Sequence, residues 1–255
     1  MRRWRTALAV VGAMVAMPAL AGCGSGGDPG SGQTLTVLAA ASLKETFTEL
    51  AEEFEAAHPG VEVSLAFDSS ATLAAQAVEG APADLLATAD TRTMADAVDG
   101  DALAGDPEVF ATNGATVVVP AGNPAGVSSF ADLDDDAVTY VVCVEDAPCG
   151  AVARTLLDGA GITHDPASLE VDVKAVLAKV VADEADAGIV YVTDATAAGD
   201  AVEQVTIPGA DAEPLEYPIG VLEQAEQPEL AQEFLDLVLG QDGQAVLGDA
   251  GFGSP

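Results

Sequence analysis

Short apolar strands alternate with amphipathic helices along this chain, and this alternation restricts the fold more than any other feature. Residues 34–41 (TLTVLAAA) form an apolar run of strand length, and Leu43, Phe47, Leu50 and Phe54 then recur at helical spacing. Further apolar patterns predict a strand, a shorter helix and a third strand, over residues 61–67, 71–78 and 84–87. This order is typical of a doubly wound α/β sheet with helices on both faces.

The alternation starts again after residue 113. Strands are predicted over residues 117–120, 138–144, 188–192 and 202–207, and helices over 151–157 and 173–182. A last strand and two helices follow, over residues 217–222, 230–239 and 244–247. We therefore predict an α/β chain with two lobes, each a doubly wound mixed sheet. Residues 34–112 and 209–255 would form lobe I, and residues 113–208 lobe II.

The first 33 residues have the composition of a targeting segment. Three arginines near the start precede an uncharged apolar stretch over residues 7–20, which is too short for a comfortable membrane span. The following Leu20-Ala21-Gly22-Cys23 resembles the lipobox of bacterial lipoproteins, in which the cysteine is acylated. We predict a signal peptide over 1–22, a lipid on Cys23 and a flexible Gly/Ser tether over 23–33. The alternative is an ordinary signal peptide with an incidental cysteine.

The charge balance is strongly acidic. The chain has 42 Asp and Glu against eight Lys and Arg, and three of those eight (Arg2, Arg3 and Arg5) lie in the predicted signal peptide, which leaves five. Nucleic acid is excluded as a partner, because phosphate binding needs Lys and Arg. The acids are spread along the chain, so we expect a solvated acidic shell.

Two cysteines remain if Cys23 carries a lipid. Cys143 and Cys149 are separated by five residues, which is neither a C-x-x-C redox motif nor half of a paired zinc motif. An even pair in an exported chain favours a disulfide. The alternative is two separate thiols.

The motifs of common enzymes are missing from the sequence. The two histidines, His58 and His164, lie in separate predicted units, and no metal-ligand spacing, nucleophile elbow or P-loop occurs. We therefore expect no enzyme activity, no cofactor and no bound metal cation.

Small hydroxyl residues occupy points where predicted strands end and helices begin. Ser42 follows the first strand, and Ser69 and Ser70 follow the second. Ligands of open α/β sheets bind at the carboxyl ends of strands, and helix N-termini offer unpaired N–H groups that suit an anion. The alternative is that each serine only caps its helix, and Ser42 with Glu45 has the spacing of a capping box.

Seven short segments occur in a specific order: AAASL (39–43), FDSSATLA (67–74), GAPADL (80–85), PCG (148–150), DVK (172–174), GIVY (188–191) and EYPI (216–219). As an ordered set they resemble the molybdate-binding periplasmic proteins of ABC transporters, the ModA family. The similarity runs from about Thr34 to Gly253. It implies a two-lobe periplasmic-binding-protein fold with a ligand cleft between the lobes, where neutral donors hold a tetrahedral dianion.

The resemblance also implies the residues that bind the oxyanion. They are the hydroxyls of Ser42, Ser70 and Tyr191 and the backbone N–H groups of Cys149 and Val173. Two positions depart from the family: Cys149, where Ala is frequent, and Asp68, where a small residue is common. Lys44 and Lys174 lie beside predicted ligand residues, and we expect both to be solvated lysines on helix faces.

We therefore expect an extracytoplasmic, lipid-anchored monomer that captures molybdate or tungstate and delivers it to the permease of an ABC transporter. The nearest alternative is a receptor of the same fold for another oxyanion, such as sulfate or phosphate, because fold alone names no ligand. A periplasmic enzyme is the more distant alternative.

Overall fold

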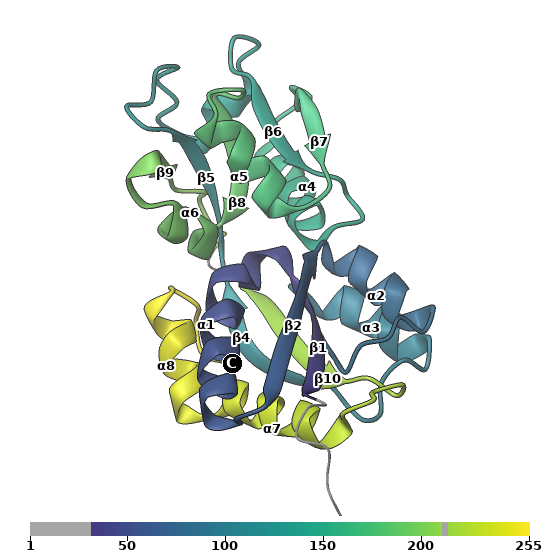
Figure 1. Ribbon diagram of the computed structural model, residues 1–255. Coiled ribbons are helices and arrows are strands. Elements are labelled where there is room, and N and C mark those ends of the chain that lie inside the picture. Colours follow the sequence, from purple (N-terminus) through teal and green to yellow (C-terminus); the bar gives the residue numbers. More distant parts are fainter. Residues whose placement is uncertain (1–31, 211–213) are drawn as a thin grey trace, which may run out of the picture. The chain divides into compact units, whose positions relative to one another are not determined.

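The computed structural model describes residues 32–210 and 214–255 (Figure 1). The predicted signal peptide, Cys23 and most of the predicted tether lie outside the described residues. Within the described ranges, no helix is long and apolar enough to cross a membrane.

The first of two mixed sheets has five strands in the order β2-β1-β3-β10-β4. Strand β1 runs parallel to β2 and β3, whereas β10 is antiparallel to both β3 and β4. The bounds are β1 (Gln33–Ala40), β2 (Val61–Asp68), β3 (Leu85–Ala87), β4 (Glu108–Asn113) and β10 (Leu215–Val221).

The second sheet repeats this arrangement with the strand order β7-β6-β8-β5-β9. Strand β6 is parallel to β7 and β8, and β5 is antiparallel to β8 and β9. The bounds are β5 (Ala115–Pro120), β6 (Tyr140–Cys143), β7 (Ser168–Glu170), β8 (Ala187–Tyr191) and β9 (Val202–Val205). The chain passes between the sheets twice, from β4 to β5 and from β9 to β10. The α/β class with two mixed sheets is thus confirmed, and we call each sheet with its helices a lobe.

Helices cover both faces of the first sheet (Figure 1). On one face lie α1 (Lys44–Ala57), α7 (Pro228–Leu239) and α8 (Gln241–Asp249), and on the other α2 (Ser70–Val78) and α3 (Thr91–Asp99). Strand β1 serves both faces, because successive side chains point to opposite sides. Leu35 and Val37 pack toward α1, and Leu38 packs toward α2.

An aromatic cluster joins α1 to α7 and stabilises that face. The ring of Phe234 lies 5.9 Å from Phe47 and 5.4 Å from Phe54, both in edge-on geometry. All three side chains are almost completely buried, and each contributes about 1.5–3 kcal/mol by leaving water. The helical spacing of Phe47 and Phe54 is what places both rings on the buried face of α1.

The second sheet is also covered on both faces. Its helices are α4 (Pro148–Ala160) on one face, α5 (Val173–Val181) on the other and α6 (Val192–Ala198), which follows β8. Three short 3-10 turns complete the described elements: η1 (Ala41–Leu43), η2 (Phe130–Asp134) and η3 (Gly199–Ala201). Each lobe therefore buries both sides of its sheet, so inner strands such as β5, β6 and β8 are nearly continuous apolar runs.

Candidate functional site

A small pocket lies where the two lobes meet, at the carboxyl ends of strands from both sheets. It contains about 210 Å³ of space free of protein atoms, part of it open to solvent. Its lining is Ala40, Ala41, Ser42, Asp68, Ser69, Ser70, Ala89, Pro148, Cys149, Asp172, Val173 and Tyr191. The structure thus brings together all five residues predicted to bind an oxyanion, from segments up to 149 positions apart in the sequence.

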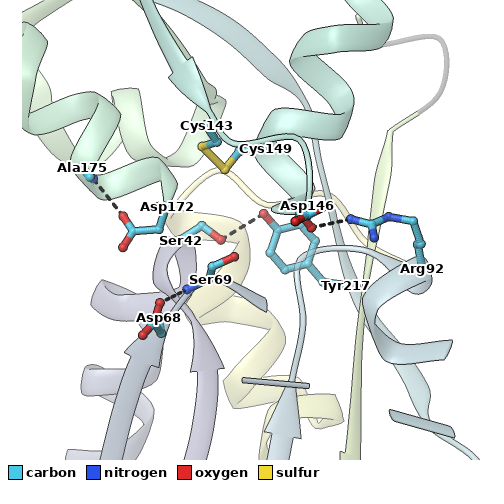
Figure 2. The surroundings of a disulfide bond; sticks show 10 residues. All are labelled: Ser42, Asp68, Ser69, Arg92, Cys143, Asp146, Cys149, Asp172, Ala175 and Tyr217. Atoms are coloured by element: carbon cyan, nitrogen blue, oxygen red, sulfur yellow. Dashed lines mark hydrogen bonds between the residues drawn. A yellow bond between two sulfur atoms is a disulfide. The ribbon is translucent and has the colours of Figure 1, made fainter. Parts of the chain in front are cut away.

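Ser42 lies in η1, between strand β1 and helix α1, and it is 4% exposed. Its Oγ lies 3.1 Å from the hydroxyl of Tyr217, as Figure 2 shows. Helix α1 begins at Lys44, and no side chain caps its N-terminus. The predicted capping box of Ser42 and Glu45 is therefore wrong, because the 3-10 turn moves the helix start past Ser42 and Tyr217 binds the hydroxyl instead.

Ser70 is the first residue of α2, directly after β2. Its Oγ accepts a hydrogen bond of 2.9 Å from the backbone N–H of Ala89, and the side chain is 2% exposed. Because the oxygen already accepts this bond, the hydroxyl proton is available to the pocket. Ser70 does not cap α2, because the N-cap position of this helix is occupied by Ser69. The side chain of Ser69 makes no capping hydrogen bond.

Cys149 is held at the start of α4 by three local constraints. Cys143 and Cys149 form a disulfide, which confirms the predicted pair (Figure 2). Pro148 occupies the first turn of the helix, where its missing N–H costs nothing. A Cβ on Gly150 would lie 1.9 Å from the carbonyl oxygen of Val144, so only glycine lets the helix start this close to β6. The Cys149 N–H is one of those that a helix leaves without an internal acceptor.

Val173 opens α5 in the same way. The carboxylate of Asp172 accepts a 2.8 Å hydrogen bond from the backbone N–H of Ala175, which fixes Asp172 as the N-cap (Figure 2). Val173 is the first residue of the helix, so its backbone N–H has no acceptor within the helix. Two helix N-termini, those of α4 and α5, therefore present N–H groups and partial positive charge to the pocket.

Tyr191 ends β8 and precedes α6. Its side chain is 2% exposed, and among the described residues its hydroxyl has no hydrogen-bond partner of acceptable geometry. Burial raises the pKa of Tyr191 well above its ordinary value, so the hydroxyl keeps its proton. A buried tyrosine hydroxyl without a partner is costly unless a ligand supplies one.

Asp68 is the feature of the pocket least suited to an anion. Its carboxylate accepts a hydrogen bond of 2.6 Å from the backbone N–H of Ser69, which occupies one of its oxygens (Figure 2). Apart from Asp172, whose carboxylate caps α5, the remainder of the lining offers neutral hydroxyls, backbone N–H groups and small apolar side chains. The arrangement can hold a small anion by hydrogen bonds but provides no strong base or nucleophile.

The basic side chains of Lys174 and Arg92 make polar contacts that cross between the lobes. Lys174 of α5 places its Nζ 2.7 Å from Glu45 of α1 and 2.9 Å from Asp194 of α6. Arg92 of α3 donates a 2.8 Å hydrogen bond to the carbonyl oxygen of Asp146, inside the disulfide loop (Figure 2). These contacts connect the first lobe to the second.

The expectation that Lys174 is a solvated surface lysine is wrong. Its side chain is only 22% exposed and pairs with two carboxylates. Burial lowers the pKa of Lys174, but Asp194 and Glu45 outweigh burial and raise it. Burial also raises the pKa of Asp194, against the opposing effect of Lys174. Within the described part of the chain, the oxygens of Asp194 accept no well-aligned hydrogen bond, so the contact of Asp194 with Lys174 is an ion pair rather than a directed bond.

Tyr217 and Asn113 were not predicted as part of the site. Tyr217 lies in β10, and its hydroxyl contacts both Ser42 and the side-chain amide of Asn113 at the end of β4. The only sequence signal was the EYPI segment at 216–219, which marked the family but not a role. In the described parts of the chain, no group of three or more His, Cys, Asp or Glu side chains could hold a metal ion.

Comparison with known proteins gives the same picture over nearly the whole chain. Residues 35–253 match the family model described as bacterial extracellular solute-binding protein. The molybdate-binding protein ModA of Mycobacterium tuberculosis is 41% identical over 92% of this chain and 93% of its own length. A putative ABC transporter substrate-binding lipoprotein of Bacillus subtilis, YvgL, is 29% identical over 95% of this chain and 96% of its own. The periplasmic molybdate-binding protein of Azotobacter vinelandii shares the fold, with a TM-score of 0.75, 20% identity and coverage of 87% and 99%.

Proposed function

We propose that this chain, which belongs to the bacterial extracellular solute-binding protein family, captures molybdate and delivers it to an ABC transporter. The single observation that carries the proposal is the pocket between the lobes, where five predicted donors converge and no strong base or nucleophile is present. The 41% identity to a molybdate-binding protein over 92% of the chain supports the choice of ligand. The chain is a binding protein and not an enzyme, as its family is.

The oxyanion is held by neutral donors from both lobes. Ser42 and Ser70 of the first lobe donate from their hydroxyls, and Tyr191 of the second lobe donates from opposite them. The backbone N–H groups of Cys149 and Val173 add two donors at helix N-termini, where an anion is favoured. Donors from both lobes reach one small ligand only when the lobes are together, so binding stabilises the closed arrangement.

The acidic composition does not prevent anion binding. At physiological ionic strength, exposed charges more than about 8 Å away are largely screened. Donors that touch the ligand inside a closed pocket act at hydrogen-bond distance and are screened much less. The surface acids should instead slow the association of the anion at low salt.

The proposal extends to the N-terminal segment and to the lobe boundaries. Residues 1–22 direct export, Cys23 carries the lipid that holds the protein at the outer side of the cell membrane, and residues 23–33 form the tether. The lipoprotein name of the Bacillus subtilis relative supports the anchor. Lobe I comprises residues 34–112 and 209–255, lobe II comprises 113–208, and the protein acts as a monomer on its permease. Tungstate is a second ligand, since it is nearly the same size as molybdate.

Calorimetric titration of the purified protein with molybdate, tungstate, sulfate and phosphate tests the function. We expect tight one-to-one binding of molybdate and tungstate, and much weaker binding of the other two. A tighter response to sulfate or phosphate would mean that the receptor serves another oxyanion. Mass spectrometry of protein extracted from membranes tests the anchor, and an unmodified Cys23 or a mature N-terminus elsewhere would rule it out.

A further inference from the structure

We propose that Asn113 and Tyr217 are positioning residues that turn the Ser42 hydroxyl into a hydrogen-bond donor toward the pocket. This inference rests on the proposed function, because it assigns how one donor of the same pocket is oriented toward the ligand. It depends on three consecutive hydrogen bonds whose directions can be worked out from their partners.

The orientation of the Asn113 amide is the first step. The backbone N–H of Gly114 donates a 2.9 Å hydrogen bond to Asn113 Oδ1, so the oxygen of the amide must face Gly114. The nitrogen then faces the opposite way, where it lies 3.3 Å from the Tyr217 hydroxyl and 2.8 Å from Thr193 Oγ1. An amide nitrogen only donates, so Tyr217 must accept from Asn113.

The direction of the Tyr217 hydroxyl follows from this bond. The oxygen accepts from Asn113, and the hydroxyl has one proton left to donate. Among the described residues, Ser42 Oγ at 3.1 Å is the atom placed to accept that proton. Tyr217 is fully buried, and burial raises its pKa far above the ordinary range, so the proton is always present.

The direction of the Ser42 hydroxyl is the last step. Its oxygen accepts from Tyr217, so its own proton is left to point into the pocket that Ser42 lines. Ser70 has the same polarity, because its oxygen accepts from the backbone N–H of Ala89. Tyr191 offers a proton that no described residue accepts. Three of the four hydroxyls in the pocket lining, those of Ser42, Ser70 and Tyr191, are therefore arranged as donors.

This polarity suits a tetrahedral oxyanion without a proton. Such a dianion, molybdate for example, accepts hydrogen bonds from every direction, so each hydroxyl that is arranged as a donor finds an acceptor on it.

Tyr217→Phe tests the chain of bonds, with the molybdate affinity measured by calorimetry on the purified protein. Once Ser42 can rotate, molybdate should bind about 2- to 10-fold more weakly, the equivalent of one neutral hydrogen bond. Tyr140→Phe is the matched control, because Tyr140 is also buried and its hydroxyl bonds only to the carbonyl oxygen of His164, away from the pocket. We expect it to leave the molybdate affinity unchanged.

A double-mutant cycle distinguishes positioning from a general effect on the fold. If Tyr217 acts through Ser42, Tyr217→Phe should weaken molybdate binding no further in a Ser42→Ala protein. Equal losses in the two backgrounds would overturn the inference. If Tyr217→Phe does not fold, Asn113→Asp serves instead. The new carboxylate still accepts from the backbone N–H of Gly114, but it reverses the direction of the hydrogen bonds to Tyr217 and from Tyr217 to Ser42. Its effect should likewise be larger with Ser42 present than without it, and an equal effect would refute the polarity.

The cycle also separates this inference from the proposed function. If the wild-type protein binds sulfate rather than molybdate, the choice of ligand is wrong, but the same cycle with sulfate still tests the polarity. If molybdate binds as proposed and the cycle shows no coupling, only the inference fails. Absence of binding to any of these oxyanions would overturn both.

Discussion

Replacement of Ser42 by alanine separates a ligand residue from a structural one. The substitution removes one hydroxyl that lines the pocket and bonds Tyr217. If that hydroxyl donates to a charged oxyanion, its loss costs about 1.5–3 kcal/mol of binding free energy. At about 1.4 kcal/mol per decade, molybdate should bind about 10- to 100-fold more weakly.

The same substitution also affects stability, by a smaller amount that the structure allows us to work out. Ser42 caps no helix, so no capping energy is lost. The bond to Tyr217 is neutral and contributes about 0.5–1.5 kcal/mol. For a protein of this size, each kcal/mol lowers Tm by about 2–4 °C. The apo protein should therefore melt a few degrees lower at most.

The assay is calorimetric titration with molybdate together with thermal melting of the apo protein. Thr46→Ala is the matched control, because Thr46 is one turn further along, equally buried, and donates to the carbonyl oxygen of Leu43 without lining the pocket. It should lower Tm by a similar amount and leave the dissociation constant unchanged. If Ser42→Ala lowers Tm while molybdate binds as tightly as before, Ser42 is a structural residue and not a ligand.

Three further predictions concern the surroundings of the pocket. Replacing Cys143 and Cys149 together by serine should cost about 2 kcal/mol of unfolding free energy and lower Tm by about 4–8 °C; an unchanged melting curve would show that the disulfide adds nothing. Arg92→Gln removes a bond between the lobes and should weaken molybdate binding about 2- to 5-fold. The control Arg154→Gln removes the same charge from a helix within one lobe and should leave molybdate affinity unchanged. Equal losses of affinity in the two variants would mean that Arg92 acts through its charge and not through its bond to Asp146. Burial raises the pKa of Glu170, but hydrogen bonds from its lysine and serine partners outweigh burial and lower it, so this group stabilises the fold above its unfolded pKa. As pH falls below about 5, the wild type should lose stability more steeply than Glu170→Gln, and parallel acid denaturation curves would contradict this.

The sequence by itself was sufficient for the order of most elements and for the pairing of the cysteines. The periodic helices α1, α5 and α7 and the buried strands β1, β5 and β8 all lie close to their predicted positions. Their patterns are readable because each element buries a large apolar face, and burial imposes a period of 3.6 or 2 on the residues. The edge strands β4 and β7 and the helices α3 and α6 were missed. β7 and α6 have only three and seven residues, and an edge strand buries little surface.

For the pocket, the sequence supplied candidate residues, and the tertiary structure decided what each of them touches. Helix N-termini at Cys149 and Val173 could be predicted from Pro148 and Asp172, because helix starts depend on neighbours within a few positions. The bonds from Asn113 to Tyr217 and from Tyr217 to Ser42 join residues 104 and 175 positions apart, and only the assembly of the first sheet, in which β10 pairs with β4 and β3, and β3 with β1, brings them together. Lys174 looked like a surface lysine because the helical pattern of α5 says nothing about Glu45 and Asp194, which approach it from other elements. Local spacing determines which helix or strand carries a side chain and on which face of that element it lies. The partners of the side chain depend on contacts that form only when the sheets assemble, and these partners decide its protonation and the direction of its hydrogen bonds.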